Sequence, residues 1–398
     1  MILQNFTRLP HLSIGMKKNL FLNASCVYNG ILLPYVKSIN RAYSKAEDDP
    51  PDDEDVRKSR PCKQFTTIGK ILNSVGAKSL AGNNKVSVIG LDDIGIATVF
   101  ALLTQNVTDN VCMIDLNEEV LKGEHLDLQY SSVFLNNPCI TASKDPAATR
   151  ESKVCVVTTG TFKGRDEDES EYVARNAGII RAIVPSLMRH SPNAIYIIAS
   201  DPVDILSYTT WKLSGVPKHK VIGTGTMLDT ARFRYLLSDK LGISPEHCHG
   251  FVIGQQGQRS VPVWSSVNIA GVRLKDINPQ IGTERDPESW SEVHEEVMKS
   301  ADKVRQLKGN SSWAVALAVS DLCRAIFTNK NTVIPVSTHV KGEHSIREDV
   351  FLSLPCVIGR SGVTDIVRQT LTEVEALQLR RCAENVAQMQ EFASKLMT

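Results

Sequence analysis

The chain has 398 residues, of which 42% are hydrophobic and 22% are charged, which is enough for two packed domains and excludes a disordered chain, a collagen-like fibre and a coiled-coil rod. Its 45 basic and 44 acidic residues leave a formal charge of +1, so no global positive field recruits nucleic acid. The nine cysteines include no CxxC pair and no zinc-ligand spacing with histidine, so we expect reduced, mostly buried thiols and no metal site. The sequence has no run of about 18 apolar residues, so we expect no membrane span.

The amino-terminal 46 residues carry six basic side chains and no acidic one. This composition is typical of a mitochondrial transit peptide, whose positive charge is drawn inward by the membrane potential. Arg41-Ala42-Tyr43-Ser44 resembles a matrix-peptidase cleavage site, so we assign residues 1–44 to the transit peptide and expect a protein of the mitochondrial matrix. The alternative is a merely basic disordered tail. Seven acids follow within nine residues, so residues 45–82 are predicted to be an acidic linker and an N-terminal arm.

From Lys85 onward, short apolar strands alternate with helical patterns, which is typical of a doubly wound, parallel α/β sheet of the Rossmann type. The expected strands are 85–90, 111–115, 154–160 and 194–200, and the expected helices are 94–103 and 171–189. After these, longer helices are expected at 229–241, 290–307 and 372–396, with hairpin-like stretches between them. The sequence therefore predicts a Rossmann domain over 83–224 and a second, mixed α/β domain over 225–398.

The first strand ends in Gly90-Leu-Asp92-Asp-Ile-Gly95, which matches the dinucleotide-binding pattern G-x-G-x-x-G except at its middle position. Asp115, 20 residues beyond Gly95 at the end of the second strand, is the acid expected to bond the ribose hydroxyls. The middle glycine lets the backbone approach the pyrophosphate, whereas Asp92 puts a negative side chain there. The repulsion between this carboxylate and a phosphate about 4 Å away is on the order of 4 kcal/mol before the solvent relaxes. We therefore expect weak dinucleotide binding or none. Gly90 and Gly95 would also let the helix pack on the strand, whatever binds.

Five stretches carry a more specific pattern: LKGEHLDLQ at 121–129, DPVDILSY at 201–208, LDTARFR at 228–234, SVPVWS at 260–265 and VFLSLPC at 350–356. In this order and nearly ungapped spacing they resemble the L-lactate dehydrogenase family, within the lactate/malate dehydrogenase superfamily. The resemblance implies a Rossmann domain, a mixed α/β substrate domain, NAD as cofactor, a homotetramer or dimer, and the interconversion of lactate and pyruvate.

The resemblance also implies a set of catalytic groups for transferring hydride from reduced nicotinamide to a 2-oxo acid. A histidine donates the proton, a carboxylate orients it, one arginine holds the substrate carboxylate, and a second arginine on a closing loop polarises the carbonyl. Asp229 matches the orienting carboxylate, and Arg232, on the same helical face, matches the carboxylate-binding arginine. Without the resemblance, we would interpret both as ordinary charges of a helix.

Other positions depart from the family pattern. Gln256 stands where the catalytic histidine should be, and an amide cannot supply general acid–base catalysis, which is commonly worth about 10²- to 10⁴-fold in rate. Asp201 replaces an asparagine beside the substrate and the nicotinamide ribose, and so brings a negative charge into a site meant for anions. Ser311 replaces a threonine of the pocket wall, which is a mild change. His249 matches a structural stretch, and we do not interpret it as a replacement base.

The predicted mobile loop begins at Gly160, a cofactor-binding position, and Phe162 replaces an arginine that faces the cofactor phosphates. In ungapped alignment, Glu169 replaces the carbonyl-polarising arginine and reverses its charge. Lys163 falls at the specificity position, and a register shift would bring Arg165 toward the substrate. The loop carries five acids that would repel a 2-oxo acid, and we interpret it as a solvated acidic loop without catalytic duty.

We weigh three functions. The first is an L-lactate dehydrogenase-like mitochondrial pseudoenzyme, because phosphate approach, carbonyl polarisation and proton transfer fail together. The second is a working NAD-dependent lactate or malate dehydrogenase, in which Lys163 or Arg165 handles the 2-oxo or 2-hydroxy acid and water or Asp201 relays the proton. The third is a non-catalytic structural or regulatory subunit, in a homo-oligomer or in a hetero-oligomer with an active family member. We expect no nucleic-acid or membrane partner in any of the three.

Overall fold

The structure, a computed structural model, describes residues 84–164 and 166–395. The predicted transit peptide over 1–44 and the predicted acidic arm over 45–82 lie outside the described residues.

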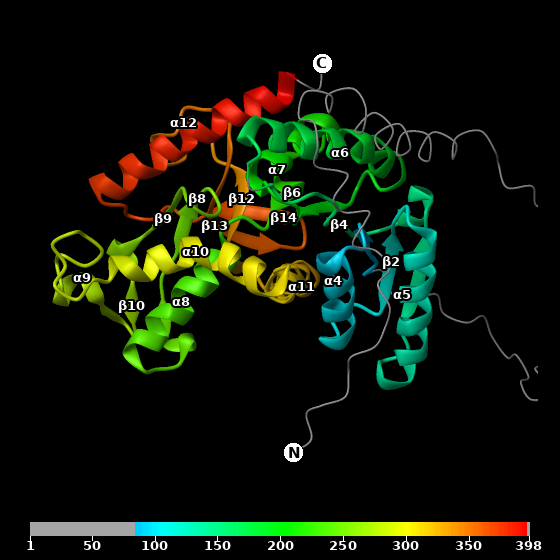
Figure 1. The fold of residues 1–398 in the computed structure, drawn as a ribbon, viewed down its shortest axis with the longest axis horizontal. Helices are drawn as coiled ribbons and strands as arrows, with labels where there is room; N and C mark the ends of the chain where they lie inside the picture. The colour runs from blue at the N-terminus through cyan, green and yellow to red at the C-terminus, as the bar shows by residue number, and fades with distance from the viewer. Residues whose placement is uncertain (1–83, 165, 396–398) are drawn as a thin grey trace, which may run out of the picture.

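The first half of the described chain is a parallel sheet with helices on both faces (Figure 1). Its strands, in spatial order β3-β2-β1-β4-β5-β6, are Cys139–Ser143, Asn110–Ile114, Val86–Ile89, Val154–Val157, Ile195–Ile198 and Val221–Gly223. Its helices are α4 (Asp93–Thr104), α5 (Glu118–Tyr130), α6 (Glu169–His190) and α7 (Val203–Ser214). Every residue of β1 and β4 is buried, which is why both strands are almost wholly apolar; the one polar side chain in them, Ser87, hydrogen-bonds the Ser152 hydroxyl (2.7 Å). The strand order reverses between β1 and β4, which is where ligands bind in such sheets, and it confirms the predicted Rossmann fold.

The second half continues the same sheet in antiparallel fashion. Its helices are α8 (Met227–Leu241), α9 (Leu274–Ile277), α10 (Ser291–Lys308), α11 (Ser312–Thr328) and α12 (Glu373–Lys395). Its strands are β7 (Cys248–His249), β8 (Val252–Gly254), β9 (Ser260–Pro262), β10 (Asn268–Ile269), β11 (Val272–Arg273), β12 (Thr332–His339), β13 (Phe351–Gly359) and β14 (Gly362–Ile366). β12 pairs with β6 through Ser337 and Gly223, so one 11-stranded sheet runs through both halves of the described chain. β7, β10 and β11 form a separate small sheet.

Helix α11 ties the second half back to the first. In Figure 1 it lies beside α4, and the two helices pack through Ala97, Ala101 and Ala316. Residues of α11 also join the apolar cluster on one face of the parallel strands, while α6 and α7 cover the other face. Near the carboxyl ends of the parallel strands, the loop after β4 and the start of α6 contact α10 and the turn between β8 and β9, and we call the region between these elements the cleft.

The boundaries of the predicted elements shift by a few residues. Helix α6 starts at Glu169 instead of 171 because the Asp168 carboxylate accepts a hydrogen bond from Ser170 N (2.9 Å) and caps the helix. The described cysteines are unpaired and, except for Cys139, buried, as predicted for that part of the chain. Within residues 84–164 and 166–395, no helix combines the length and the apolar character needed to cross a membrane.

Replacing Gly95 with alanine tests how tightly α4 packs on β1. A Cβ on Gly95 would collide with the carbonyl oxygen of Gly90, so Gly95→Ala should lower the free energy of unfolding by about 2 to 4 kcal/mol in urea denaturation. Gly178→Ala in α6 is the matched control, because a Cβ there meets no atom of the described residues and should be neutral or stabilising by up to about 1 kcal/mol. Equal effects of the two substitutions would contradict this account of the turn.

Candidate functional site

The glycine-rich turn between β1 and α4 has no room for side chains at its two glycines. Gly90 has a φ of +100°, and a Cβ on it would lie 2.7 Å from Thr159 N. Gly95 brings α4 against the Gly90 carbonyl. Packing alone therefore requires both glycines, whatever ligand binds.

Asp92 occupies the amino-terminal end of α4. Its carboxylate accepts hydrogen bonds from Ile94 N (3.1 Å) and Gly95 N (2.9 Å). Loss of hydration raises the pKa of Asp92, the two N–H groups oppose this, and the charges of Asp93 and Asp115 add to it. The N–H groups of a helix amino terminus are natural donors to a phosphate, and here an internal carboxylate holds two of them.

Asp115 lies directly after β2, where the ribose-binding acid was predicted. Its Oδ2 accepts from Leu91 N (2.7 Å) and its Oδ1 from Asn117 N (2.8 Å). Each carboxylate oxygen can accept a second bond, so Asp115 still offers acceptors to a ribose. Asp115 therefore keeps acceptors for a ribose, and the charges of Asp93 and Asp115 both act on Asp92 in the neighbouring turn.

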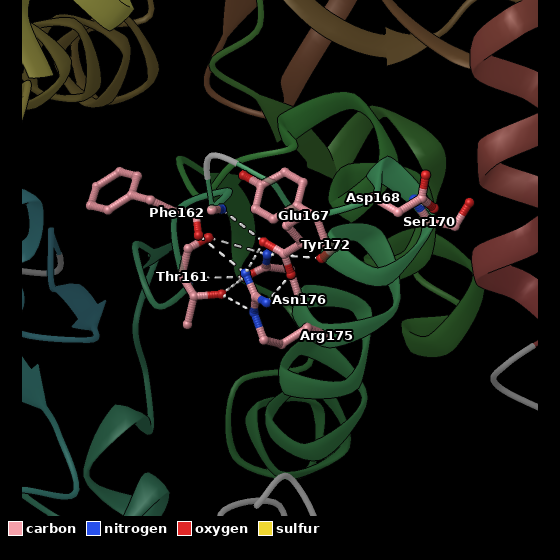
Figure 2. A network of polar contacts seen from close by, with 9 residues as sticks. Thr161, Phe162, Glu167, Asp168, Ser170, Tyr172, Arg175 and Asn176 are labelled. Atoms are coloured by element: carbon pink, nitrogen blue, oxygen red, sulfur yellow. Dashed lines mark hydrogen bonds and ion pairs between the residues drawn. The ribbon is translucent and has the colours of Figure 1, made fainter. Parts of the chain in front are cut away.

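The loop after β4 is held by Arg175 and Asn176 of α6, at the centre of the network in Figure 2. Arg175 donates to Thr161 Oγ1 (2.7 Å), to Phe162 O (3.1 Å) and, from both terminal nitrogens, to the Glu167 carboxylate. Asn176 Oδ1 accepts from Thr161 N (2.8 Å). Burial alone would raise the pKa of Glu167, but bonding to Arg175 outweighs it and the pKa is lowered. The prediction of a solvated acidic loop is therefore wrong at Glu167, whose side chain is only 12% exposed.

Glu169, the first residue of α6, forms a two-bond ion pair with Arg259 in the turn between β8 and β9. Arg259 Nη1 lies 3.0 Å from Glu169 Oε1, and Nη2 lies 3.3 Å from Oε2. The sequence analysis did not identify Arg259, because the two residues are 90 positions apart and neither has a local signature. The negative charge predicted for this loop position is thus neutralised from the second half of the chain.

Phe162 contacts a second arginine that the sequence analysis missed. The guanidinium of Arg305, in the last turn of α10, lies 4.9 Å from the centre of the Phe162 ring. A basic residue at a helix carboxyl end is common on surfaces, so its sequence position gives no sign that it reaches the cleft. The loop after β4 therefore contributes the aromatic ring of Phe162 to this contact, and α10 contributes the guanidinium of Arg305.

Asp229 and Arg232 of α8 bond each other. Arg232 Nη1 donates to Asp229 Oδ1 (3.0 Å), and Gly257 N donates to Asp229 Oδ2 (3.0 Å). Asp229 is 2% exposed, and burial raises its pKa while Gly257 N–H and Arg232 oppose the rise. The carboxylate predicted to orient a histidine instead fixes the turn that carries Gln256, and the guanidinium predicted to hold a substrate is paired internally.

Gln256 directly precedes Gly257 in this turn. Its N–H donates to Asp204 Oδ2 (3.2 Å), while its side-chain Oε1 is buried and accepts no hydrogen bond from any described residue. Gln256 therefore lies beside the carboxylates of Asp204 and Asp201, and its own amide side chain does not titrate.

Asp201, just after β5, faces the same turn. Burial raises the pKa of Asp201, the charges of Arg305 and Arg232 oppose the rise, Asp229 adds to it, and the Gln256 side chain lowers it. Asp201 therefore lies within electrostatic range of Asp229, Arg232 and Arg305 and beside the Gln256 side chain.

Asp204 is a buried acid that the sequence analysis did not single out. Burial raises its pKa to about 7, the Ser337 hydroxyl and Gln256 N–H oppose the rise, and Asp201 and Asp229 add to it. The sequence did contain a signal for this buried acid. Asp204 lies within the apolar run Val203-Asp-Ile-Leu206, and an acid flanked by apolar residues on a packed helix is buried along with them.

Two predicted positions have mainly structural surroundings. A Cβ on Gly160 would lie 3.3 Å from both Asn176 Oδ1 and Ser200 Cβ, so the loop leaves β4 through a tight space. Ser311 precedes α11 without a side-chain cap bond to that helix. Lys163 is exposed, and Arg165 lies outside the described residues.

The histidines near this region are engaged elsewhere. His294 Nε2 lies 3.0 Å from Ser260 Oγ, burial lowers the pKa of His294 to about 4, and the opposing charge is Glu295 rather than a cleft carboxylate. His249 is exposed on β7, in agreement with our interpretation that it is no replacement base. The two oxygens of Asp229 accept from Arg232 and from Gly257 N, and no hydrogen bond between Asp229 and a histidine is found among the described residues.

The raised pKa of Asp204 makes stability depend on pH. Between the usual carboxyl pKa and about 7, the folded state keeps the Asp204 proton and the unfolded state has lost it, so the contribution of Asp204 to stability falls as pH rises. The Asp204→Asn variant has no proton to lose at this position, and its side-chain oxygen can still accept a hydrogen bond from Gln256 N. In urea denaturation, the free energy of unfolding of the variant minus that of the unchanged protein should rise by about 1 kcal/mol per pH unit from about pH 5 to pH 7 and then level off. Asp239→Asn, an exposed position of α8, should give a flat difference, and a flat profile for Asp204→Asn would refute the buried acid.

Comparison with known proteins assigns the chain to a family. The sequence pattern of the lactate/malate dehydrogenase NAD binding domain matches residues 84–223, and that of the lactate/malate dehydrogenase alpha/beta C-terminal domain matches residues 226–395. The chain is 45% identical over 326 residues to the L-lactate dehydrogenase B chain of Sceloporus undulatus, covering 82% of this chain and 97% of that protein. It is 47% identical over 322 residues to the L-lactate dehydrogenase A chain of Danio rerio, covering 81% and 97%.

A third relative, the L-lactate dehydrogenase of Petromyzon marinus, is 47% identical over 309 residues, covering 78% of this chain and 92% of that protein. The chain therefore belongs to the lactate/malate dehydrogenase family, and the first half of its described residues is the NAD-binding domain of that family.

Proposed function

We propose that this family member does not interconvert lactate and pyruvate at the rate typical of its family and acts as a non-catalytic subunit. The observation that carries the proposal is the turn between β8 and β9, where Gln256 stands at the proton-donor position and both oxygens of Asp229 are already bonded to Arg232 and Gly257 N. A reacting carbonyl beside this turn would meet an amide, which cannot donate a proton at an ordinary pKa.

The dinucleotide end supports the same proposal. Asp92 holds the N–H groups of Ile94 and Gly95 that a pyrophosphate would use. A bound dinucleotide would have to displace this carboxylate and sit beside Asp93 and Asp115 as well. We therefore propose that NAD binding is weakened in this chain. The nicotinamide would supply the hydride if it bound.

The second candidate is a working dehydrogenase that uses Asp201 as its acid. Burial raises the pKa of Asp201, so this carboxyl holds its proton more strongly than an ordinary aspartate, and it lies within the influence of Arg305, Arg232 and Gln256. In this case turnover with reduced dinucleotide would fall as pH rises through the pKa of Asp201, and Asp201→Asn would abolish it.

We further propose that the protein assembles through α5 and the turn after it, in the mitochondrial matrix. Tyr130, Val133 and Phe134 are 73%, 84% and 88% exposed there, and helix α5 lies at one edge of the molecule in Figure 1. Large apolar side chains exposed side by side favour an interface with a second copy or with an active relative. The matrix location rests on the basic, acid-free composition of the first 46 residues.

An activity assay separates the two candidates. The purified full chain with reduced NAD and pyruvate, or oxaloacetate, should turn over at least about 10²-fold more slowly than the Danio rerio A chain assayed alongside. The triple variant Gln256→His, Glu169→Arg, Asp201→Asn should gain on the order of tenfold, while Gln256→Asn, which keeps an amide, should gain nothing. A rate for the unchanged chain within tenfold of the relative would refute the proposal, and sensitivity of that rate to Asp201→Asn would establish the second candidate.

A fractionation experiment tests assembly and location together. The tagged full chain expressed in cultured animal cells should be recovered from the mitochondrial matrix in particles larger than one chain, and deletion of residues 1–44 should keep it outside. Phe134→Asp should reduce the particle size in sedimentation, whereas Val374→Asp, 65% exposed on α12, should leave it unchanged. A monomer at all concentrations would count against a subunit role.

A further inference from the structure

A chain of hydrogen bonds outside the candidate site joins Asp349, His339 and Lys218. Asp349, in the loop between β12 and β13, accepts from His339 Nε2 at its Oδ1 (2.7 Å) and from Lys212 Nζ of α7 at its Oδ2 (2.8 Å). On the other side of the imidazole ring, Lys218 Nζ lies 3.3 Å from His339 Nδ1. Lys218 begins η5 (Lys218–Lys220), the short turn that leads into β6. We call Asp349, His339 and Lys218 the lysine triad.

The imidazole ring of His339 is held in one orientation. His339 is the last residue of β12, and its side chain is only 10% exposed. The centre of its ring lies 5.2 Å from that of Trp211 and 6.1 Å from that of Phe351. Any rotation of the ring would break its bonds to Asp349 and Lys218 and disturb these packing contacts, so the ring is positioned before any reagent arrives.

The hydrogen-bond partners of the ring fix where its proton lies. An ionised carboxylate only accepts, so His339 Nε2 carries a proton toward Asp349, and the neutral ring keeps a free lone pair on Nδ1. Burial lowers the pKa of His339, the bond to Asp349 opposes this, and the charges of Lys218 and Lys212 add to it. The ring is therefore largely neutral at pH 7 and above, and its Nδ1 faces the Lys218 nitrogen as a base.

Lys218 is exposed whereas the ring behind it is mostly buried, so a reagent in solvent reaches the amine first. The order carboxylate, imidazole, nucleophile is the one with which serine hydrolases activate a hydroxyl group. A lysine amine that attacks a carbonyl carbon must lose a proton as the new bond forms, and a base within hydrogen-bond reach speeds this step. The lysine triad supplies such a base for an amine.

We propose that Lys218 is an acylation site for acyl thioesters, with His339 as the base and Asp349 as the residue that orients its ring. The ammonium group first loses a proton to water, and the free amine attacks the thioester carbonyl carbon. His339 Nδ1 takes the second proton from the attacking nitrogen, the C–S bond breaks, and the leaving thiolate receives that proton. The products are an amide on Lys218 and a free thiol, so the step needs no oxidant or reductant. This inference does not depend on whether the protein is a dehydrogenase.

Incubation of the full chain with acetyl-CoA, followed by mass spectrometry of its peptides, tests the lysine triad. The initial rate of acetylation at Lys218 is divided by that at Lys330, an exposed lysine just before β12, in the same digest. Lys218 should react about tenfold faster, which is less than a fully positioned base achieves because the lysine side chain is exposed. His339→Gln keeps a donor for Asp349 but has no nitrogen that takes a proton, so it should bring the ratio to within about twofold of one.

The matched control is His219→Gln, the same chemical change in the residue next to Lys218, which should leave the ratio unchanged. Asp349→Asn should lower the ratio about threefold, because the ring keeps its place but loses the carboxylate that orients it. Equal rates at Lys218 and Lys330 in the unchanged chain would overturn the proposal, as would an undiminished ratio in His339→Gln or an equal loss in His219→Gln. The rates are read without dinucleotide or 2-oxo acid and so stand apart from the activity assay.

Discussion

Carboxylates at the candidate site are bonded to hydrogen-bond donors of the protein itself, and this pairing recurs throughout the site. Asp92 uses the N–H groups at the start of α4, Asp229 uses Arg232 and Gly257 N, and Glu169 uses Arg259. Each of these donors is of the kind that would otherwise hold a phosphate or a substrate carboxylate. The acidic residues at the site thus do more than repel anions, because they take up the donors that anions need.

The scaffold does not depend on this chemistry. The strands β1, β4 and β5 are buried over their whole length, and the packing of α4 on β1 requires Gly90 and Gly95 without any reference to a cofactor. Residues that hold the fold and residues that perform the reaction are therefore largely separate sets. This separation explains how a chain can be 45% to 47% identical to L-lactate dehydrogenases and still carry Gln256 where the family resemblance predicts the proton donor.

The sequence predicted what depends on local pattern and missed what depends on distant contact. Alternating strands and helices predicted the parallel sheet, and the family resemblance singled out Asp201, Asp229, Arg232 and Gln256. Arg259 and Arg305 escaped notice because their partners lie far away in the chain. For β12 and β13 the sequence predicted only hairpin-like stretches without bounds; in the structure Pro335 and Pro355 face each other there, where proline normally argues against a central strand. Glu167 was misjudged because composition cannot reveal that Arg175 covers it.

The continuous sheet has a consequence for how such a chain can change over evolutionary time. Because β6 pairs with β12 across the boundary between the halves, deleting the second half would leave β6 as an unpaired edge strand. Its exposed N–H and C=O groups could then pair with other chains. A lineage that abandons hydride transfer therefore cannot discard the half that bound the substrate without exposing the other to aggregation. Selection for solubility alone preserves both halves together, long after selection for turnover has ceased.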